Sequence, residues 1–490
     1  MELKFVKIFS GLLVLNLVLS PVLGNLYKRE SEHAARDPRE IGQPVGEVDH
    51  QIGNLRGQTG EGYSLKVLIG TPPQELNVLI DTGSSNFAVA CSQNDNIDTY
   101  FRKDKSSTYV EVGTAVNVPY TVGSWSGTLG RDNVTIATMP GSMVEANIAC
   151  INEAENFYIN GSNWQGILGL AYTDIARPDS SIEPYFDSLV KDGKFPNFFG
   201  VQLCGLGYIS PNPDKMTGGS IVFGSLAPSL YHSELYATPL YKEWFYEVIL
   251  VDVEVNGQSL AMDCKEYNFE KTIVDTGTTN LRLPRRVFTK LVHMMKQQIT
   301  NSEWLHEGFW TGIENLCWRE GQAPYGDFPD VSVVLPINNT AAFRIMVTPQ
   351  QYLRWVGDDN DDKPENDCFK LAISGMETAS VLGAIVMEGY YVVFDRARKQ
   401  VMFAESTCDG LKPSINASIP YSGNFMDCAY KKPKNHDRTL TIVGYVMAGI
   451  CGICVLPLIF LIAQWQCRRL RCGRKLLRQN SDSNDLMNTS

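Results

Sequence analysis

The 490-residue sequence predicts an all-β fold of two related lobes, followed by one C-terminal transmembrane helix. Between residues 61 and 428 most apolar runs are short, β-branched or aromatic, and end at Gly, Pro, Asn or Asp, which is typical of sheets and barrels. A motif near residue 80 recurs near residue 275. Close to the C-terminus, a long uncharged stretch is sufficient to cross a bilayer about 30 Å thick.

Length and composition exclude several classes of protein. A chain of 490 residues is too long for one domain. Acidic residues outnumber basic ones, 54 to 43, which argues against a nucleic-acid partner because such proteins carry a basic patch. The sequence contains no HExxH, GxSxG, GxGxxG or GxxxxGK[ST] motif, so it gives no support to zinc peptidase, α/β-hydrolase or nucleotide-binding chemistry.

The N-terminus reads as a cleaved signal peptide, residues 1–24. Lys4 and Lys7 precede an apolar run, and the small residues Val22 and Gly24 suit the cleavage positions. A signal anchor is the alternative, but the apolar run is short for a membrane span. We therefore expect the protein to enter the secretory pathway.

The C-terminal stretch Leu440–Ala463 carries no charge and reads as the transmembrane helix. The basic residues between Arg468 and Arg478 place the C-terminus in the cytosol by the positive-inside rule. Basic residues between Lys431 and Arg438 weaken this asymmetry, and the signal peptide decides the orientation. The sequence predicts a single-pass type I protein in a lipid bilayer, with its body in the lumen or outside the cell.

The cysteines divide along this topology. The lumenal part holds eight, enough for four disulfides in an oxidising compartment, and spacing alone allows 105 pairings: Cys91, Cys150, Cys204, Cys264, Cys317, Cys368, Cys408 and Cys428. Cys451 and Cys454 lie in the span, whereas Cys467 and Cys472 lie just inside it and are either palmitoylated or free. Lumenal N-glycosylation sequons begin at Asn133, Asn160, Asn338 and Asn416.

The pattern of the body, taken in chain order, predicts strands with a few helices between them. Expected strands include Tyr63–Ile69, Leu76–Ile80, Val116–Tyr120, Ser220–Phe223, Tyr246–Val255 and Tyr390–Phe394. Apolar residues at helical spacing predict helices over Ile182–Lys191 and Arg285–Ile299, and Pro284 suits the start of the second.

One element occurs twice. The segments Asn77–Phe87 and Thr272–Leu281 both run from an apolar strand into Asp-Thr-Gly-[Ser/Thr]-[Ser/Thr]-Asn. Each is followed by a second apolar-apolar-Gly element, ending at Gly169 and Gly383. The chain therefore looks like two related lobes that each present one aspartate, Asp81 or Asp275.

The residue types in the repeat explain what two such turns would do together. A single Asp-Thr-Gly is more often an ordinary turn in which the Asp caps its own backbone. If two turns meet, however, the carboxyls of Asp81 and Asp275 share one proton, because like charges about 3 Å apart cannot both ionise. One carboxylate can then activate a water while the other donates to a carbonyl, with no metal or other cofactor. Ser84 and Thr278 can support the pair through their hydroxyls.

This constellation resembles the pepsin-like aspartic proteases over about residues 61–428. The resemblance implies a bilobal fold with Asp81 and Asp275 as the catalytic dyad and a mobile flap that closes over substrate. The flap and substrate-binding residues that it implies are Tyr120, Thr121, Trp125, Gly277 and Arg282. Without the motif, Tyr120 and Trp125 would be strand-packing aromatics and Arg282 a solvated arginine.

Longer matches, such as DTGSSNFAVA, INGSNWQGILGLAYTDIARPD and MEGYYVVFDRARK, together with the membrane span, resemble the beta-secretase (memapsin) branch of that family. The branch implies membrane-tethered cleavage of the ectodomains of other membrane proteins, of which amyloid-precursor-like proteins are the best-known class. It also implies the disulfides Cys204–Cys408, Cys264–Cys428 and Cys317–Cys368. Cys91 and Cys150 are left over, and we predict a bridge between them, with two free thiols as the alternative.

The same resemblance suggests processing and sorting. Arg36 and Arg39 form a basic R-x-x-R site where the branch carries a propeptide boundary, so a convertase is expected to cut after Arg39; a charged linker is the alternative. Asp482–Met487 resembles an acidic dileucine signal that cytosolic adaptor proteins would read in Golgi, endosome and cell-surface traffic. The predicted parts are signal peptide 1–24, propeptide 25–39, N-terminal lobe 40–200, C-terminal lobe 201–430, linker 431–439, transmembrane helix 440–463 and cytoplasmic tail 464–490.

The sequence thus predicts a membrane-anchored aspartic endopeptidase that is active at acidic pH. Two other functions are weighed against it. A catalytically dead peptide receptor of the same fold would usually have lost an aspartate, and both are present. A digestive protease held on a lysosomal membrane would cut with less selectivity than a protease that sheds ectodomains.

Overall fold

The computed structural model describes two compact units, Met1–Tyr430 and Lys431–Ser490, each taken by itself here. The described residues are 52–58, 60, 62–93, 95–120, 123–158, 163–205, 218–299, 305–319, 323, 325–357, 366–412, 414–431 and 438–485. The predicted signal peptide, the Arg39 processing site, Thr121, Asn160 and the Leu486–Met487 signal lie outside them.

The first unit is built mainly from β-strands, which confirms the predicted fold class. Its largest sheet has the order β11-β26-β25-β9-β10-β1-β2-β3-β8-β4-β7-β6-β5. In chain order these strands are β1 (Ile52–Gln58), β2 (Gly62–Ile69), β3 (Gln74–Asp81), β4 (Phe87–Ala90), β5 (Val110–Pro119), β6 (Ser124–Ile136), β7 (Met139–Glu155), β8 (Gly166–Gly169), β9 (Phe198–Leu203), β10 (Gly219–Phe223), β11 (Tyr236–Pro239), β25 (Tyr390–Asp395) and β26 (Gln400–Glu405).

Three smaller sheets complete the unit. The first, of order β12-β13-β16-β24-β17-β23, holds β12 (Lys242–Glu243), β13 (Tyr246–Glu247), β16 (Thr272–Val274), β17 (Leu281–Pro284), β23 (Ile373–Met376) and β24 (Ser380–Leu382). The second, β15-β14-β19-β20-β27, holds β14 (Asp252–Val255), β15 (Gln258–Ser259), β19 (Val331–Pro336), β20 (Ala341–Val347) and β27 (Ile415–Pro420). The third, β18-β22-β21, holds β18 (Leu316–Arg319), β21 (Leu353–Gly357) and β22 (Asn366–Leu371).

Helices are short and few in the described part of the first unit. They are α2 (Tyr185–Lys191), α3 (Cys264–Tyr267), α4 (Arg285–Gln298), α5 (Glu307–Trp310), α6 (Pro349–Tyr352) and α7 (Ala384–Met387). The two predicted helices correspond to α2 and α4, and Pro284 stands at the N-cap of α4. The buried face of α4 carries Val287, Leu291 and Met295, the spacing that predicted it.

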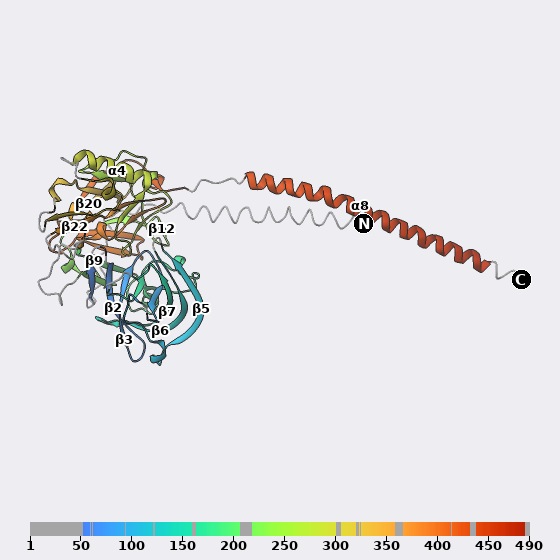
Figure 1. Ribbon diagram of the computed structural model, residues 1–490, viewed down its shortest axis with the longest axis horizontal. Coiled ribbons are helices and arrows are strands. Elements are labelled where there is room, and N and C mark those ends of the chain that lie inside the picture. The colour runs from blue at the N-terminus through green and yellow to red at the C-terminus, as the bar shows by residue number, and fades with distance from the viewer. Residues whose placement is uncertain are drawn as a thin grey trace. The chain divides into compact units, whose positions relative to one another are not determined.

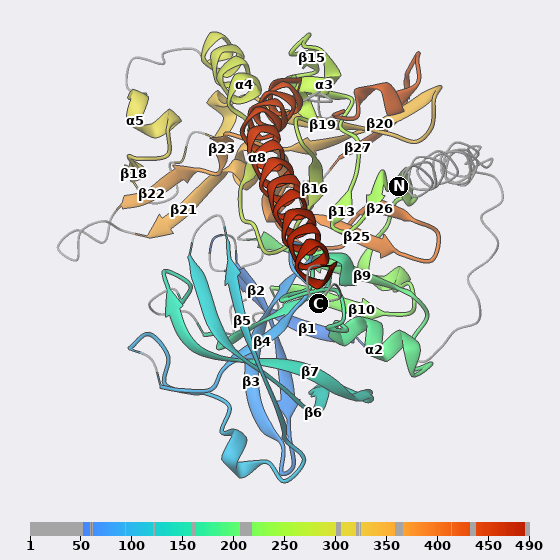
Figure 2. The same cartoon turned by 90° about the vertical axis from the view of Figure 1, so that its right-hand side faces the viewer.

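Two lobes are visible within the unit (Figures 1 and 2). Strands β2, β3, β5, β6 and β7 lie at one end and β20, β21 and β22 at the other, with β9 and β25 between them. The predicted boundary at residue 200 falls inside β9, which pairs with β25 from the C-terminal part of the chain. The large sheet therefore joins the two lobes.

The sequence repeat is also a repeat of topology. In the first lobe β3 pairs in parallel with β8, and β8 pairs antiparallel with β4. In the second lobe β16 pairs in parallel with β24, and β24 pairs antiparallel with β17. Each aspartate follows or ends the first strand of its set, so both are placed by the same local architecture.

One predicted strand is wrong as a single element. The run Tyr246–Val255 is divided into β13 and β14, with four buried residues between them. At Leu250 the backbone bonds to a side chain: Asn268 accepts from its N–H at 2.9 Å and donates to its carbonyl at 2.7 Å. These side-chain bonds replace a strand partner there, so the apolar run is extended and buried without forming one ladder.

Four disulfides staple the first unit: Cys91–Cys150, Cys204–Cys408, Cys264–Cys428 and Cys317–Cys368. The bridge between Cys91 and Cys150, which the sequence left open against free thiols, is formed, and it ties the end of β4 to β7. The other three are the pairs that the resemblance implied.

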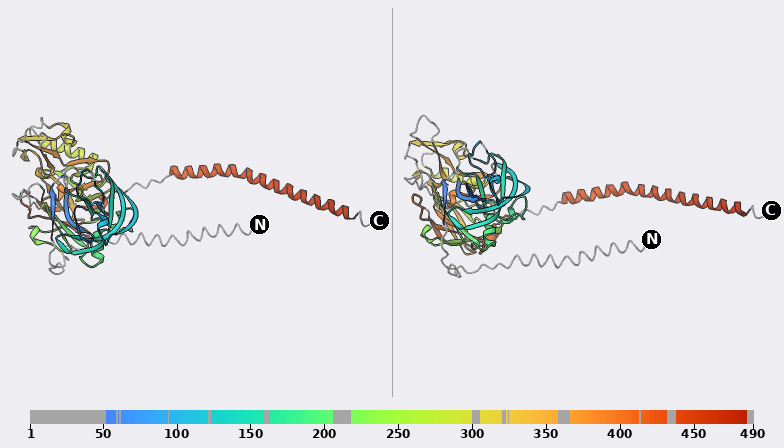
Figure 3. Two further views of the ribbon diagram at one scale, coloured as in Figure 1. Left: turned by 60° about the horizontal axis from the view of Figure 1, so that its bottom comes forward. Right: turned by 90° about the horizontal axis from the view of Figure 1, so that it is seen from below.

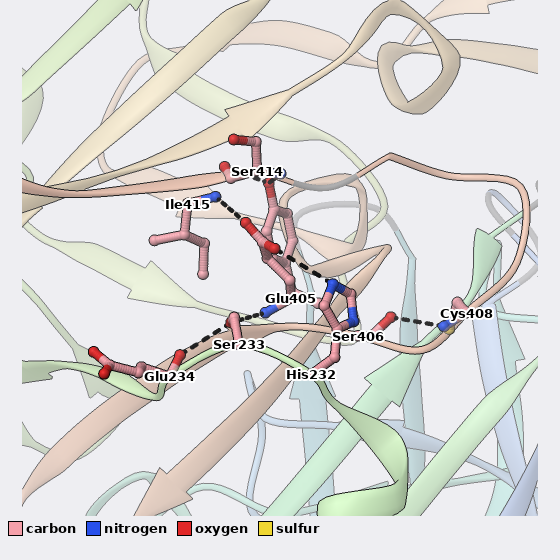
Figure 4. A network of polar contacts seen from close by, with 9 residues as sticks. His232, Ser233, Glu234, Glu405, Ser406, Cys408, Ser414 and Ile415 are labelled. Atoms are coloured by element: carbon pink, nitrogen blue, oxygen red, sulfur yellow. Dashed lines mark hydrogen bonds and ion pairs between the residues drawn. The ribbon is translucent and has the colours of Figure 1, made fainter.

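A polar network fixes the segment that carries Cys408 (Figure 4). The two oxygens of Glu405, at the end of β26, contact the His232 ring at 3.4 Å and the backbone N–H of Ile415 at 2.8 Å. The Ser233 hydroxyl accepts from the Glu405 backbone N–H at 2.8 Å. Glu405 thus connects the end of β26 to the start of β27 and to residues 232–233, which precede β11.

The second unit contains α8 (Arg438–Asp485), drawn as one continuous helix in Figure 3. Within it, Gly444–Arg471 is long and apolar enough to cross a membrane. Pro457 lies inside the helix, which a membrane helix tolerates. Residues 444–463 of the predicted span Leu440–Ala463 lie within it.

Candidate active site

Two carboxyls are held by matching turns at the ends of β3 and β16. The Asp81 carboxylate accepts from the Gly83 backbone N–H at 2.8 Å and from the Ser84 hydroxyl. In the second lobe the Asp275 carboxylate accepts from the Gly277 N–H at 2.8 Å and the Thr278 hydroxyl at 2.7 Å. Each turn thus bonds both oxygens of its own carboxylate, the backbone N–H on Oδ1 and the hydroxyl on Oδ2.

The two turns are locked together by the threonines between Asp and Gly. Thr82 donates its hydroxyl to the Val274 carbonyl at 3.0 Å and accepts from the Thr276 backbone N–H at 3.0 Å. Thr276 makes the reciprocal bonds, to the Ile80 carbonyl at 2.8 Å and from the Thr82 N–H at 3.1 Å. Both threonines are almost fully buried, so these four bonds fix the lobes to each other at the dyad.

The glycines of the turns let the two carboxyls approach each other. A Cβ added to Gly83 would lie 2.6 Å from the carboxylate of Asp275, and one added to Gly277 would overlap the carboxylate of Asp81. A side chain at either position would therefore push into the opposite aspartate. The third residue of each motif must be glycine because of this close approach, although neither has a left-handed backbone.

The electrostatics follow from this geometry. Asp81 and Asp275 are 4% and 7% exposed, and the glycine of each turn lies against the carboxylate of the other. Burial, and then the negative charge of Asp275, raise the pKa of Asp81 well above its ordinary value, against the opposing bonds from Ser84 and Gly83. The pair therefore holds one proton at pH values where an exposed aspartate would have lost it.

A β-hairpin made by β5 and β6 carries the predicted flap residues Tyr120 and Trp125. The Tyr120 N–H donates to the Gly123 carbonyl at 3.0 Å, which joins the two sides of the hairpin. The Trp125 indole donates to the Tyr120 hydroxyl at 3.0 Å, so the two aromatic residues are bonded and not merely packed. Burial and the charge of Asp81 raise the pKa of Tyr120, so its phenol keeps its proton beside the dyad.

Arg282 lies on β17, opposite Val381 of β24. It is half-buried, and burial lowers its pKa while the negative charge of Asp275 acts in the opposite direction. Arg282 is therefore near enough to the dyad for the charge of Asp275 to act on it, and its role in binding substrate stays a prediction. Gly277 lies in the second turn itself.

Two features of the site were not anticipated from the sequence. The reciprocal bonding of Thr82 and Thr276 was missed, although the identical Thr in both motifs was a signal that could have found it. Phe157 was also missed: its ring stacks on Tyr120, with centroids 5.7 Å apart and an interplanar angle of 18°. Nothing in the sequence near residue 157 indicates that contact.

The sequon asparagines differ in exposure. Asn416 is exposed on β27, whereas Asn133 on β6 and Asn338 before β20 are half-buried. The Asn338 side-chain oxygen accepts from the Thr340 backbone N–H at 2.8 Å. Glycosylation at these positions stays a prediction.

A buried pair of aspartates on two interlocked, related β lobes, beneath an aromatic-bearing hairpin, defines the class of aspartic endopeptidases. The model of the eukaryotic aspartyl protease family matches residues 62–406, and the chain belongs to that family. Within it, the chain is 45% identical over 467 residues to beta-secretase of Strongylocentrotus purpuratus, covering 89% of this chain and 86% of that protein.

More distant relatives share the protease part. Cathepsin E-A of Xenopus laevis is 28% identical over 70% of this chain and 79% of its own length. Pepsin II-1 of Oryctolagus cuniculus is 27% identical over 70% of this chain and 80% of its own length. The chain is therefore an aspartic protease of beta-secretase type with a C-terminal candidate membrane helix.

Proposed function

We propose that the protein is a membrane-anchored endopeptidase that cleaves the ectodomains of other membrane proteins at acidic pH, with Asp81 and Asp275 as its catalytic residues. The observation that carries the chemistry is the meeting of these two carboxyls from separate lobes, both buried and each bonded by its own turn. Ser84 and Thr278 support the dyad from outside, through their bonds to the two carboxylates.

The reaction follows from one shared proton. The ionised carboxylate takes a proton from a water as the water oxygen bonds to the peptide carbonyl carbon, while the protonated partner donates to the carbonyl oxygen. The resulting tetrahedral intermediate collapses as the C–N bond breaks: the leaving amine takes the proton that the first carboxyl gained from water, and one hydroxyl of the intermediate returns its proton to the second carboxylate as the C=O bond re-forms. The burial that raises the pKa of Asp81 keeps that proton on the pair in mildly acid conditions.

The flap hairpin and Arg282 are the proposed substrate-binding elements of the site. Tyr120, bonded to Trp125 and stacked on Phe157, is held close to Asp81, where it can cover a bound peptide and exclude water. Thr121 belongs to the same proposed flap. The guanidinium of Arg282 would favour acidic or polar groups on the substrate.

The proposed location is supported by α8 and by the predicted signal sequence. A type I anchor in the Golgi, endosomes and cell surface would hold the lobes in the lumen or outside the cell, next to membrane-protein substrates such as amyloid-precursor-like proteins. Similarity to a beta-secretase over 89% of the chain supports this substrate class. A convertase acting after Arg39 and adaptors at the Leu486–Met487 tail complete the proposed life cycle.

The test of the chemistry is substitution of each aspartate in the full chain. Asp81→Asn and Asp275→Asn should each lower peptide hydrolysis by about 10²- to 10⁴-fold, the usual contribution of a general acid or base. Asp104→Asn, at a carboxylate that is 71% exposed, is the control and should leave the rate unchanged. Hydrolysis that persists in both dyad variants would contradict the mechanism.

The test of the substrate class is a comparison of shed ectodomains. Cells that express the full chain should release a restricted set of ectodomains, cut close to the bilayer, which cells that express Asp81→Asn do not release. Broad and unselective proteolysis, with no enrichment of membrane proteins, would instead indicate a digestive enzyme.

A further inference from the structure

The C-terminal part of α8 is basic without any acidic residue to offset its charge. From Arg438 to Ser481 the sequence contains no Asp or Glu, and from Thr439 to Cys467 it contains no charged residue at all. The basic residues then follow in quick succession: Arg468, Arg469, Arg471, Arg474, Lys475 and Arg478. The first carboxylate after them is that of Asp482. This end of the helix is therefore a short, strongly cationic segment.

Two aromatic residues indicate where the segment lies relative to a bilayer. Tyr445 and Trp465 are both exposed on α8, near the two ends of the uncharged stretch. Their positions are separated by a helical rise of about 30 Å, the thickness of the hydrocarbon layer. Tyr and Trp are enriched at the two boundaries of that layer. Arg468 follows Trp465 by about 5 Å of helix, which places it at the level of the headgroups.

Five of the basic residues share one side of the helix. Arg468, Arg471, Lys475 and Arg478 recur at spacings of three and four residues, and Arg474 occupies the position beside them. These five residues are called the basic face below. The face belongs to the same continuous helix as the candidate span, so its place next to the membrane depends on α8 alone.

The other side of the same turns is apolar. By the 3.6-residue period, Leu470, Leu476 and Leu477 fall on that side. Arg469 also falls there, and its guanidinium lies 4.2 Å from the centre of the Trp465 ring, one turn earlier. A helix with one basic and one apolar face is typical of a segment that lies at a membrane surface.

The charge and the shape of the face define its ligand. A helix face is convex and encloses no pocket, so it selects a ligand by charge and not by the fit of one headgroup. Phosphatidylserine supplies negative charge on the cytosolic leaflet, where a basic cluster next to a span is attracted to it. Arg468 and Arg471 lie about 5 and 9 Å beyond the level of Trp465. These distances are comparable to the Debye length of about 8 Å at physiological salt.

We propose that the basic face binds phosphatidylserine headgroups of the bilayer that α8 spans, and so holds the first turns of the cytosolic tail at the membrane surface. This inference rests on the membrane anchoring proposed above. The site ends before Asp482 and Asp485, because the same headgroups repel carboxylates. Lipid binding therefore leaves the acidic end of the tail away from the surface.

The experiment uses the full chain in nanodiscs of phosphatidylcholine with a minority of phosphatidylserine. Both leaflets of a disc have the same composition, so the direction of insertion does not matter. A trace of photoactivatable phosphatidylserine or phosphatidylcholine, reactive close to the headgroup, labels the protein, and labelled peptides are mapped by mass spectrometry. The peptide with residues 467–478 should prefer the serine probe at least about fivefold, the factor for one basic residue at an anionic surface. Equal labelling by both probes would overturn the proposal.

Two variants separate charge from helix structure. The neutral variant should lose the preference; it carries Arg468→Gln, Arg471→Gln, Arg474→Gln, Lys475→Gln and Arg478→Gln. The charge-retaining variant should keep it, because the face recognises charge; it carries Arg468→Lys, Arg471→Lys, Arg474→Lys and Arg478→Lys. Gln479→Ala with Asn480→Ala is the matched control without a change of charge. A preference that survives in the neutral variant, or is lost in the charge-retaining one, would overturn the proposal.

Insertion and catalysis are measured separately. A phosphatidylcholine probe that reacts at the middle of its acyl chain should label residues 450–460 in every variant, which reports that α8 spans the disc. Hydrolysis of a soluble peptide should stay unchanged, because the basic face lies outside the unit that holds the dyad. A labelled span without serine preference would overturn lipid binding alone, whereas an unlabelled span would overturn the anchor and this inference with it.

Discussion

At the scale of single residues, the dyad combines two opposing demands. Each carboxylate accepts bonds that favour its charged form, yet burial and the second carboxylate favour the protonated form of Asp81. The result is a pair that keeps a proton for chemistry and that makes the folded state sensitive to pH.

That sensitivity gives the first prediction. The pKa of Asp81 is higher in the folded than in the unfolded chain, so its stabilising contribution is present at low pH and is lost as the pH rises through the folded value. Asp81→Asn cannot ionise and should unfold at higher denaturant concentration than wild type at neutral pH, with the difference disappearing in acid. Asp104→Asn should show no such trend. A constant difference across pH would contradict this account.

The flap gives a second prediction. Trp125→Phe removes the indole bond to the Tyr120 hydroxyl, and the loss of one such bond corresponds to about 1 kcal/mol, or roughly fivefold in kcat/KM if it acts in the transition state. Trp164→Phe is the matched control, because the buried Trp164 indole N–H has no partner among the described residues. Equal effects of the two substitutions would show that packing matters and the bond does not.

Among the site residues, those marked by the repeated motif could be predicted and those defined by contacts across the lobes could not. Asp81, Asp275 and their hydroxyl partners follow from one pattern read twice. The hydroxyls of Thr82 and Thr276 donate to backbone carbonyls nearly 200 residues away. Every residue has a backbone carbonyl, so the acceptor has no signature in the sequence. Sequence gives no sign of which carbonyl a buried hydroxyl will reach.

At the scale of elements, strands were predicted correctly where turn residues flank a short run of β-branched and aromatic residues, as at β2, β10 and β25. The division of Tyr246–Val255 escaped prediction because its interruption is made by the Asn268 side chain from outside the run. Buried apolar sequence alone does not reveal which backbone groups find strand partners.

The Cys91–Cys150 bridge is the one disulfide of the four that the family resemblance did not imply. It joins β4, which follows the first catalytic turn, to β7, which pairs with the flap strand β6. With a sequence separation of 59, loss of the bridge should cost about 4 kcal/mol on the entropic account. The double variant Cys91→Ala/Cys150→Ala should therefore unfold at markedly lower denaturant, measured on the full chain. Cys451→Ser/Cys454→Ser, outside the disulfides, should not.

At the scale of the whole molecule, the lobes are joined by a buried ion pair as well as by sheet. Arg396, 5% exposed in the turn after β25, donates to Asp187 of α2 at 2.9 and 2.7 Å. Its guanidinium also lies 4.4 Å from the centre of the Tyr172 ring. Residues from the two halves of the chain thus form one cluster far from either catalytic turn in sequence.

Breaking this cluster on one side should be costly. Arg396→Met leaves Asp187 without its partner and should lower the free energy of unfolding by about 3 kcal/mol, whereas Arg396→Met with Asp187→Leu should recover much of the loss. Lys191→Met, which removes an ion pair from a lysine that is 70% exposed, should cost less than about 1 kcal/mol. A double variant as unstable as the single one would argue against the pair.

The two-lobed plan could be predicted because both lobes repeat one motif, whereas the sheet that joins the lobes could not. The strand β9 lies between β10 and β25 in the large sheet, so the sheet continues across residue 200. The pairing of β9 with β10 and β25 is made by backbone hydrogen bonds, which leave no change in amino-acid composition at residue 200.

The reciprocal threonine bonds have a consequence for biosynthesis. Thr82 finds its partners only in Val274 and Thr276, which emerge from the ribosome nearly 200 residues later. A nascent chain whose first lobe has left the ribosome carries Asp81 and Thr82 without Asp275 and Thr276. It therefore lacks the second carboxyl that peptide hydrolysis needs. Translation itself thus delays the assembly of the proteolytic centre until the second lobe has been made.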